Sequence, residues 1–190
     1  MIAIVSVAAF LVAAAVLWLL LRSPVGARLV ALPSEARWHE QPTPLFGGIG
    51  IFAGFAAGIL LALAAGAVEW TGELGGILAG VAIVFGAGLV DDLWHLSPVA
   101  KLAAQILAAV VVLGSGLNVE IVGNDVLAWA IGLLWLVGIT NAFNLLDNMD
   151  GLAATLAIVS CAYFAIDAVT EHENNTVLLL ALAPAQHAHL

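Results

Sequence analysis

The stretch MIAIVSVAAFLVAAAVLWLLL, residues 1–21, contains no charged side chain and no proline. A helix that crosses a bilayer needs roughly 20 consecutive apolar residues, so this run predicts a membrane span. A cleaved signal peptide would carry basic residues ahead of its apolar run. Here Arg22 and Arg28 follow the run instead. We therefore expect a retained transmembrane helix.

Working outward from this run, the rest of the chain repeats its character. Of 190 residues 64% are hydrophobic and 9% are charged, whereas soluble domains average about 25% charged residues. Uncharged apolar runs recur at residues 45–68, 74–90, 102–119, 126–140, 151–166 and 176–190. The second and fourth runs of the chain have full span length, and the others extend into uncharged polar flanks. The expected fold is all-α, a polytopic transmembrane bundle of about seven spans forming a single domain over residues 1–190.

The basic residues predict how this bundle lies in the membrane. Arg22, Arg28 and Arg37 follow the first span and Lys101 follows the third, so alternating spans place all four on one side. The positive-inside rule makes that side cytoplasmic. The loops on the opposite side contain acidic residues and no Lys or Arg. We therefore expect an outside N-terminus and a location in the cell (inner) membrane.

The overall charge and the cysteine count exclude two other readings. The formal net charge of −9 argues against a nucleic-acid partner, because binding a phosphate backbone needs a basic surface. Cys161 is the only cysteine and falls within a span. It therefore indicates a small apolar side chain rather than a disulfide or a redox centre.

Three polar clusters lie at predicted cytoplasmic ends of spans, at residues 37–48, 91–101 and 141–152. A helical bundle would bring these ends together. Asp91 and Asp92 are adjacent and would point about 100° apart on a helix, whereas Asp147 and Asp150 would lie side by side.

The third cluster also contains a polar series at intervals of three residues, Asn141, Asn144, Asp147 and Asp150. This series would drift about 60° per step on an ideal α-helix. Its convergence on one site requires a bend or an unwound turn, for which Asn148 and Gly151 are suitable places.

Carboxylates gathered in a partly desolvated place repel one another unless a cation is present. The Asp and Asn oxygens of these clusters favour Mg²⁺ or Mn²⁺, and Lys101, Arg37 and Arg28 are natural phosphate partners. The clusters outline a metal–diphosphate site. An Asp pair at a helix end can also be a solvated boundary, and His39 an interfacial polar residue. The coincidence of three clusters on one side favours the site.

The same clusters resemble the polyprenyl-phosphate N-acetylhexosamine-1-phosphate transferase family, the MraY, WecA and TagO group. The resemblance rests on HEQPTPLFGGIGIF (39–52), GLVDDLWHLSPVAKLAAQ (88–105) and NAFNLLDNMDGLAA (141–154). Their order and spacing are similar to those of the family, and closer to its WecA and TagO branch. The sequence DNMDG (147–151) departs from the commoner DGxDG of that branch.

The resemblance implies an Mg²⁺-dependent reaction at the cytoplasmic membrane face in cell-envelope glycan synthesis. A polyprenyl phosphate, typically undecaprenyl phosphate, attacks a UDP-N-acetyl sugar such as UDP-GlcNAc, and UMP leaves. The resemblance implies catalytic residues and substrate-binding residues, and the metal ligands come from both groups. The catalytic residues are Asp91 and Asp92, which serve as metal ligands with Asp150; the substrate-binding residues are Thr43, Arg37, His39, Lys101, Asn141, Asn144, Asp147 and Asp150.

One departure from the family raises alternatives. Family members continue through further spans with a later Phe-x-Gly-Asp motif and a His-containing loop, which this sequence lacks. The chain therefore resembles a C-terminally truncated member, and a non-catalytic fragment or pseudoenzyme is one alternative. An ion-coupled transporter would place its acids near the midplane, and an aromatic prenyltransferase would not account for PTPLFGG (42–48). The oligomeric state stays open, a homodimer being one option.

Overall fold

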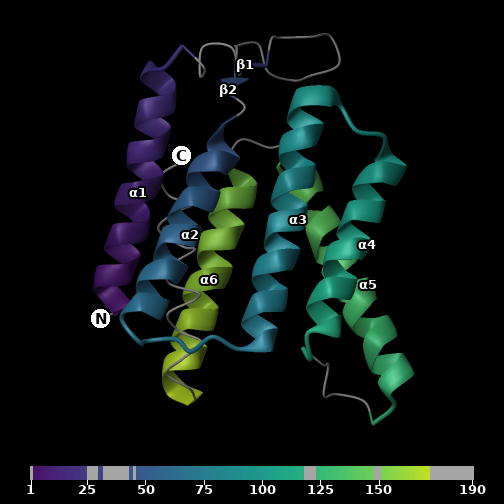
Figure 1. Ribbon diagram of the computed structural model, residues 1–190. Coiled ribbons are helices and arrows are strands. Elements are labelled where there is room, and N and C mark those ends of the chain that lie inside the picture. Colours follow the sequence, from purple (N-terminus) through teal and green to yellow (C-terminus); the bar gives the residue numbers. More distant parts are fainter. Residues whose placement is uncertain are drawn as a thin grey trace. The chain divides into compact units, whose positions relative to one another are not determined.

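A computed structural model describes residues 2–24, 30–31, 43–44, 46–117, 123–147 and 151–171 of the chain. Over these residues the chain is almost entirely helical (Figure 1). The elements are α1 (Ile2–Arg22), β1 (Val30–Ala31), β2 (Thr43–Pro44), α2 (Gly47–Ala64), α3 (Gly72–Trp94), α4 (Pro98–Gly114), α5 (Asp125–Leu146) and α6 (Leu152–Glu171). The all-α prediction is confirmed, with one pair of two-residue strands added.

The chain divides into two compact units, which are described separately. Unit 1 comprises Met1–Glu69 and Ala154–Leu190, and unit 2 comprises Trp70–Ala153. That both belong to a single transmembrane domain stays a prediction.

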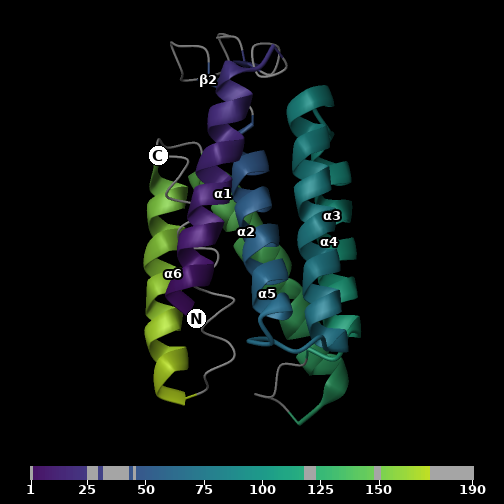
Figure 2. The same ribbon diagram turned by 60° about the vertical axis from the view of Figure 1, so that its left-hand side comes forward.

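In unit 1, α1 and α2 lie side by side (Figures 1 and 2), and small residues are buried on both helices. The buried side of α1 repeats every four residues, with Ala9 and Ala13 fully buried between Val5 and Leu17. Across from it, α2 buries a series of glycines at the same interval, which includes Gly50. A Cβ on Gly50 would overlap the Leu17 side chain. Small residues therefore allow the two backbones to approach closely, as in other membrane helix pairs.

Unit 2 contains α3, α4 and α5, and each helix contacts the next one. The turn between α3 and α4 is three residues long, so these helices are antiparallel neighbours in both views (Figures 1 and 2). Gly76 faces Ser115, and Gly80 faces Val112, with no room for a Cβ at either glycine. Close backbone approach therefore holds α3 against α4, as it holds α1 against α2.

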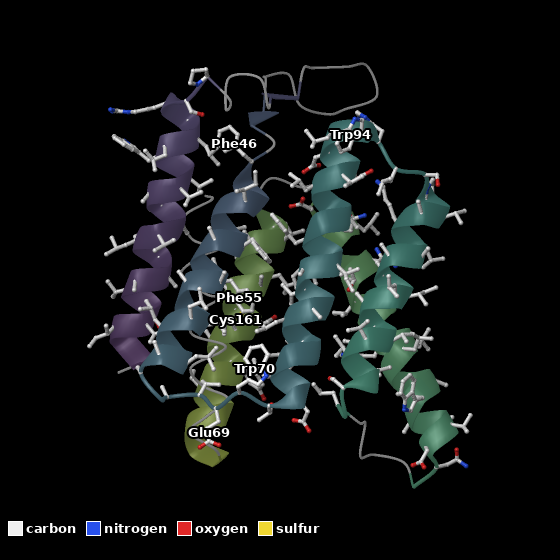
Figure 3. The ribbon with its side chains drawn as sticks, in the orientation of Figure 1. Phe46, Phe55, Glu69, Trp70, Trp94 and Cys161 are labelled. Atoms are coloured by element: carbon white, nitrogen blue, oxygen red, sulfur yellow. The ribbon has the colours of Figure 1, made fainter. Side chains whose placement is uncertain are left out.

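The helices of unit 2 have membrane dimensions. With 23 residues, α3 is about 34 Å long at 1.5 Å per residue, slightly more than the roughly 30 Å of a hydrocarbon core. Trp70 and Trp94 mark its two ends (Figure 3) and are 66% and 70% exposed. Tryptophan is enriched at both membrane interfaces, so this placement suits a helix that spans the bilayer.

Helix lengths refine the predicted spans. Four described helices are long and apolar enough to cross a membrane, namely α1, α2, α3 and α5. The predicted runs at 74–90 and 126–140 were short because the polar residues that flank them are helical too. The run at 102–119 behaves in the opposite way, since α4 ends at Gly114 and Gly116 has a left-handed φ of 109°. α4 and the apolar part of α6 are shorter, and the seventh predicted run, at 176–190, lies outside the described residues.

Candidate functional site

The end of α3 is organised around Asp91. One carboxylate oxygen of Asp91 lies 2.6 Å from the Lys101 ammonium on α4. The other oxygen accepts a hydrogen bond of 2.9 Å from the backbone N–H of Leu96. His95, the C-cap residue of α3, has a left-handed φ of 52°, and its N–H donates to the Asp91 carbonyl. Asp91 therefore closes the turn between α3 and α4 and fixes the position of Lys101.

The sequence SPVAK (97–101) explains why α4 begins where it does. Ser97 is the N-cap, and its hydroxyl oxygen accepts a hydrogen bond from the Ala100 N–H at 3.2 Å. Pro98 occupies the first helical position, where its missing N–H costs nothing. Lys101 therefore lies one turn after the Ser97 cap of α4.

A second polar contact joins α4 to α5. The side-chain amides of Gln105 and Asn141 donate to each other, at 3.3 Å from Gln105 Nε2 to Asn141 Oδ1 and 2.6 Å from Asn141 Nδ2 to Gln105 Oε1. Asn141 Nδ2 also donates to the Val137 carbonyl at 3.0 Å. Gln105 follows Lys101 by four residues, so the two side chains lie on the same side of α4. Two adjacent turns of α4 thus hold α3 and α5.

The remaining predicted residues of this region are exposed at the ends of helices. Asp92 lies in the last turn of α3, and Asn144 lies one turn after Asn141 on α5. Asp147 is the C-cap of α5, and its N–H donates to the Phe143 carbonyl. The structure therefore brings the second and third sequence clusters to one end of unit 2.

The break predicted after α5 is present at one of its two expected places. Gly151 has a left-handed φ of 70° directly before α6, a conformation that glycine adopts without steric cost. Asn148, the other expected place, lies outside the described residues. The polar series therefore does not continue along one ideal helix.

The first sequence cluster belongs to unit 1 and is described only in part. Thr43 pairs with Ala31 in the short antiparallel strand pair. Arg37 and His39 lie outside the described residues, as does Asp150 of the third cluster. The roles predicted for these residues stay predictions.

Gln105 was not among the predicted site residues, although it ends the second quoted motif. A signal was present, since it is an uncharged polar residue in an otherwise apolar helix, four residues after Lys101. Its partner could not be identified from that signal, because the pairing depends on how α4 and α5 are rotated against each other.

Comparisons with known proteins add the family. The model of glycosyl transferase family 4 matches residues 74–190, a range that includes the ion pair and every side-chain hydrogen bond described above. A probable undecaprenyl-phosphate N-acetylglucosaminyl 1-phosphate transferase of Bacillus subtilis is 32% identical over 160 residues, covering 80% of this chain and 43% of the relative. A decaprenyl-phosphate N-acetylglucosaminephosphotransferase of Mycobacterium tuberculosis is 35% identical, covering 80% of this chain and 42% of its own length.

A relative with a different name matches as well. A phospho-N-acetylmuramoyl-pentapeptide-transferase of Streptococcus suis is 34% identical, with 72% of this chain and 46% of the relative covered. No solved structure gave a significant match. The chain spans about two fifths of the length of the first two relatives.

The chain is a multi-pass membrane protein that belongs to glycosyl transferase family 4. The predicted resemblance is thereby confirmed at the level of the family. Its relatives named for undecaprenyl- and decaprenyl-phosphate substrates fit the WecA and TagO branch.

Proposed function

We propose that this chain takes part in the transfer of an N-acetylhexosamine 1-phosphate from a UDP-sugar to a polyprenyl phosphate at the cytoplasmic face of the cell membrane. The observation that supports this most is the grouping of Asp91, Asp92 and Lys101 at one end of unit 2, within the range matched by the family. The names of the relatives from Bacillus and Mycobacterium give the lipid phosphate and the N-acetylglucosamine phosphate group that is transferred, and the UDP part of the donor is our proposal.

The reaction joins two anions. An oxygen of the lipid phosphate forms a bond to the β-phosphorus of the UDP-sugar, and the bond from that phosphorus to the bridging oxygen breaks. The electron pair leaves with UMP, and a polyprenyl-diphospho-sugar remains. Because both reactants are negatively charged, the site must lower their mutual repulsion before the phosphorus can be reached.

Lys101 is suited to that task. Its ammonium carries three donors, and the ion pair with Asp91 occupies one side of it. The Lys101 side chain is 37% exposed, so a phosphate oxygen can approach it. We assign Lys101 to a substrate phosphate and Asp91 to holding Lys101 in place.

Asp92 is assigned the role closest to the reacting group. The Asp91 side chain is 27% exposed and holds Lys101, whereas Asp92 is an exposed residue about 100° further around α3. Asp92 is therefore the better placed of the two to accept a proton from the lipid phosphate or to bind a cation. Asn144 and Asp147 are assigned to the nucleotide-sugar side.

The donor chemistry fits Mg²⁺ or Mn²⁺. The described acids at this end of unit 2 are all aspartates, and hard divalent cations prefer such oxygen ligands. Among the described residues no three His, Cys, Asp or Glu side chains gather around one point, and Asp150, the third predicted ligand, lies outside them. Asp92 and Asp150 would hold the ion, which when bound neutralises diphosphate charge. An acidic end of this kind would otherwise repel both substrates.

The test is UMP release by membranes that contain the chain, supplied with UDP-GlcNAc and undecaprenyl phosphate. We expect release that EDTA abolishes and that Mg²⁺ or Mn²⁺ restores. Asp92→Asn should lower the rate by roughly 10²- to 10⁴-fold, the usual contribution of a positioned acid or base. Asp125→Asn is the matched control, since it removes the same charge in the first turn of α5, at the helix end away from Asp147; its rate should stay near that of the wild type.

Two results would count against the proposal. Absence of UMP release by the wild-type chain under all metal conditions would favour a non-catalytic member of the family. Equal rates for Asp92→Asn and Asp125→Asn would remove Asp92 from the reaction.

A further inference from the structure

The Gln105–Asn141 pair is a two-way hydrogen bond between uncharged side chains of different helices, unlike the ion pair and the helix caps described above. Each amide donates to the oxygen of the other. The second N–H of Asn141 donates to the Val137 carbonyl. The Asn141 side chain is exposed, but both N–H groups and the oxygen of its amide have partners within the protein, which favours a positioning role over the substrate contact predicted from sequence.

The pair lies about two turns in from the shared end of α4 and α5. Gln105 is eight residues after the Ser97 cap, and Asn141 is six residues before the Asp147 cap, so each lies roughly 9–12 Å along its helix at 1.5 Å per residue. Its sequence neighbours are Ala104, Ile106, Thr140 and Ala142. A partner is favourable for an amide among such neighbours, since an unsatisfied polar group costs free energy where water is scarce. The two-way bond supplies those partners only at one rotation of α5 against α4.

The rotation of α5 against α4 also determines how the residues between the amide pair and the shared end of the two helices face each other. α4 and α5 run in opposite directions, so one turn from the pair toward that end is Lys101 on α4 and Asn144 on α5. A slip of α5 by one residue would turn Asn144 by about 100°. The amide pair therefore determines the direction in which Asn144 projects from α5 at the level of Lys101.

We propose that Gln105 is a positioning residue for the phosphotransfer, which acts through Asn141 to orient Asn144 and Asp147 toward the nucleotide sugar. This role rests on the function proposed above. Asn141 then belongs to the same positioning pair, while Asn144 and Asp147 keep the substrate contact.

The two side chains differ by one methylene, which makes an exchange variant informative. Gln105→Asn shortens one side of the pair and Asn141→Gln lengthens the other. The double variant Q105N/N141Q restores the combined length and both hydrogen bonds. Thr140→Val is the matched control, because it removes a hydroxyl beside Asn141 whose hydrogen bond to the described residues stays within α5, to the Leu136 carbonyl at 2.7 Å.

The readout is kcat and KM for the UDP-sugar in the UMP-release assay, with the melting temperature of each purified variant measured in parallel. We expect each single variant to lower kcat/KM by roughly 10- to 100-fold, the scale of a small misplacement of binding groups, mainly through a raised KM. The exchange variant should recover to within about threefold of the wild type, and Thr140→Val should stay within about twofold.

The outcomes separate the two proposals. Single variants as active as Thr140→Val, or an exchange variant that folds and melts like the wild type but stays inactive, would overturn the positioning role alone. If the single variants fail to accumulate in membranes, the exchange variant compared with the wild type still decides the question. A wild-type chain that releases no UMP would overturn the proposed function, and the positioning role with it.

Discussion

A methyl group added at Gly80 tests the close packing of α3 on α4. A Cβ at this position would lie 2.5 Å from Cγ2 of Val112 and 3.3 Å from the Ala108 carbonyl oxygen. Carbon atoms in contact are normally about 3.5–4.0 Å apart, so the helices or the Val112 side chain must give by about 1 Å. Overpacking of this kind costs about 1–3 kcal/mol. Gly80→Ala should therefore destabilise unit 2.

Helix propensity acts in the opposite direction and must be separated from the packing cost. Replacing glycine by alanine within a helix gains up to about 1 kcal/mol. Gly86→Ala on the same helix measures that gain by itself, because a Cβ there meets nothing within 4 Å. The expected difference in unfolding free energy between the two variants is about 1–3 kcal/mol, with Gly80→Ala the less stable.

The assay is reversible unfolding of the detergent-solubilised chain, followed by tryptophan fluorescence. The variant Gly80→Ala/Val112→Ala removes Cγ2 and leaves only the 3.3 Å approach to Ala108. The loss of unfolding free energy in this double variant should be smaller than the sum of the losses in the two single variants, since the substitutions share one contact. Equal stability of Gly80→Ala and Gly86→Ala would refute close packing at this position, and strict additivity with Val112→Ala would refute the assigned contact.

Two further predictions concern the ion pair and the membrane orientation. Exchanging the charges of Asp91 and Lys101 in the variant D91K/K101D should raise the melting temperature above that of either single variant, because the pair is restored. Turnover should stay lost, and a doubly exchanged chain that releases UMP at the wild-type rate would contradict the phosphate role of Lys101. In a background with Cys161→Ala, Ser97→Cys should resist a membrane-impermeant thiol reagent applied to intact cells, whereas Thr71→Cys should react. The reverse labelling pattern would overturn the cytoplasmic assignment.

Local composition was enough to predict much of the fold. A run such as residues 1–21 is helical in lipid because its backbone polar groups have no other partners there. Clusters of acids and amides such as 141–152 also stand out, since they are costly among apolar residues. Span ends were less predictable, because α3 continues through the acids Asp91 and Asp92 to Trp94, and α4 ends before the left-handed Gly116.

The sequence by itself determined the helices, the polar clusters and the family resemblance, since each depends on residues close together in the chain. Only the tertiary structure decided that Asp91 rather than Asp92 holds Lys101, and that Asn141 meets Gln105. Those choices depend on how each helix is rotated against its neighbour. In a soluble helix the apolar stripe indicates that rotation. In lipid the packed and the outward-facing residues are equally apolar, so rotation is set by where glycines such as Gly76 and Gly80 let two backbones approach.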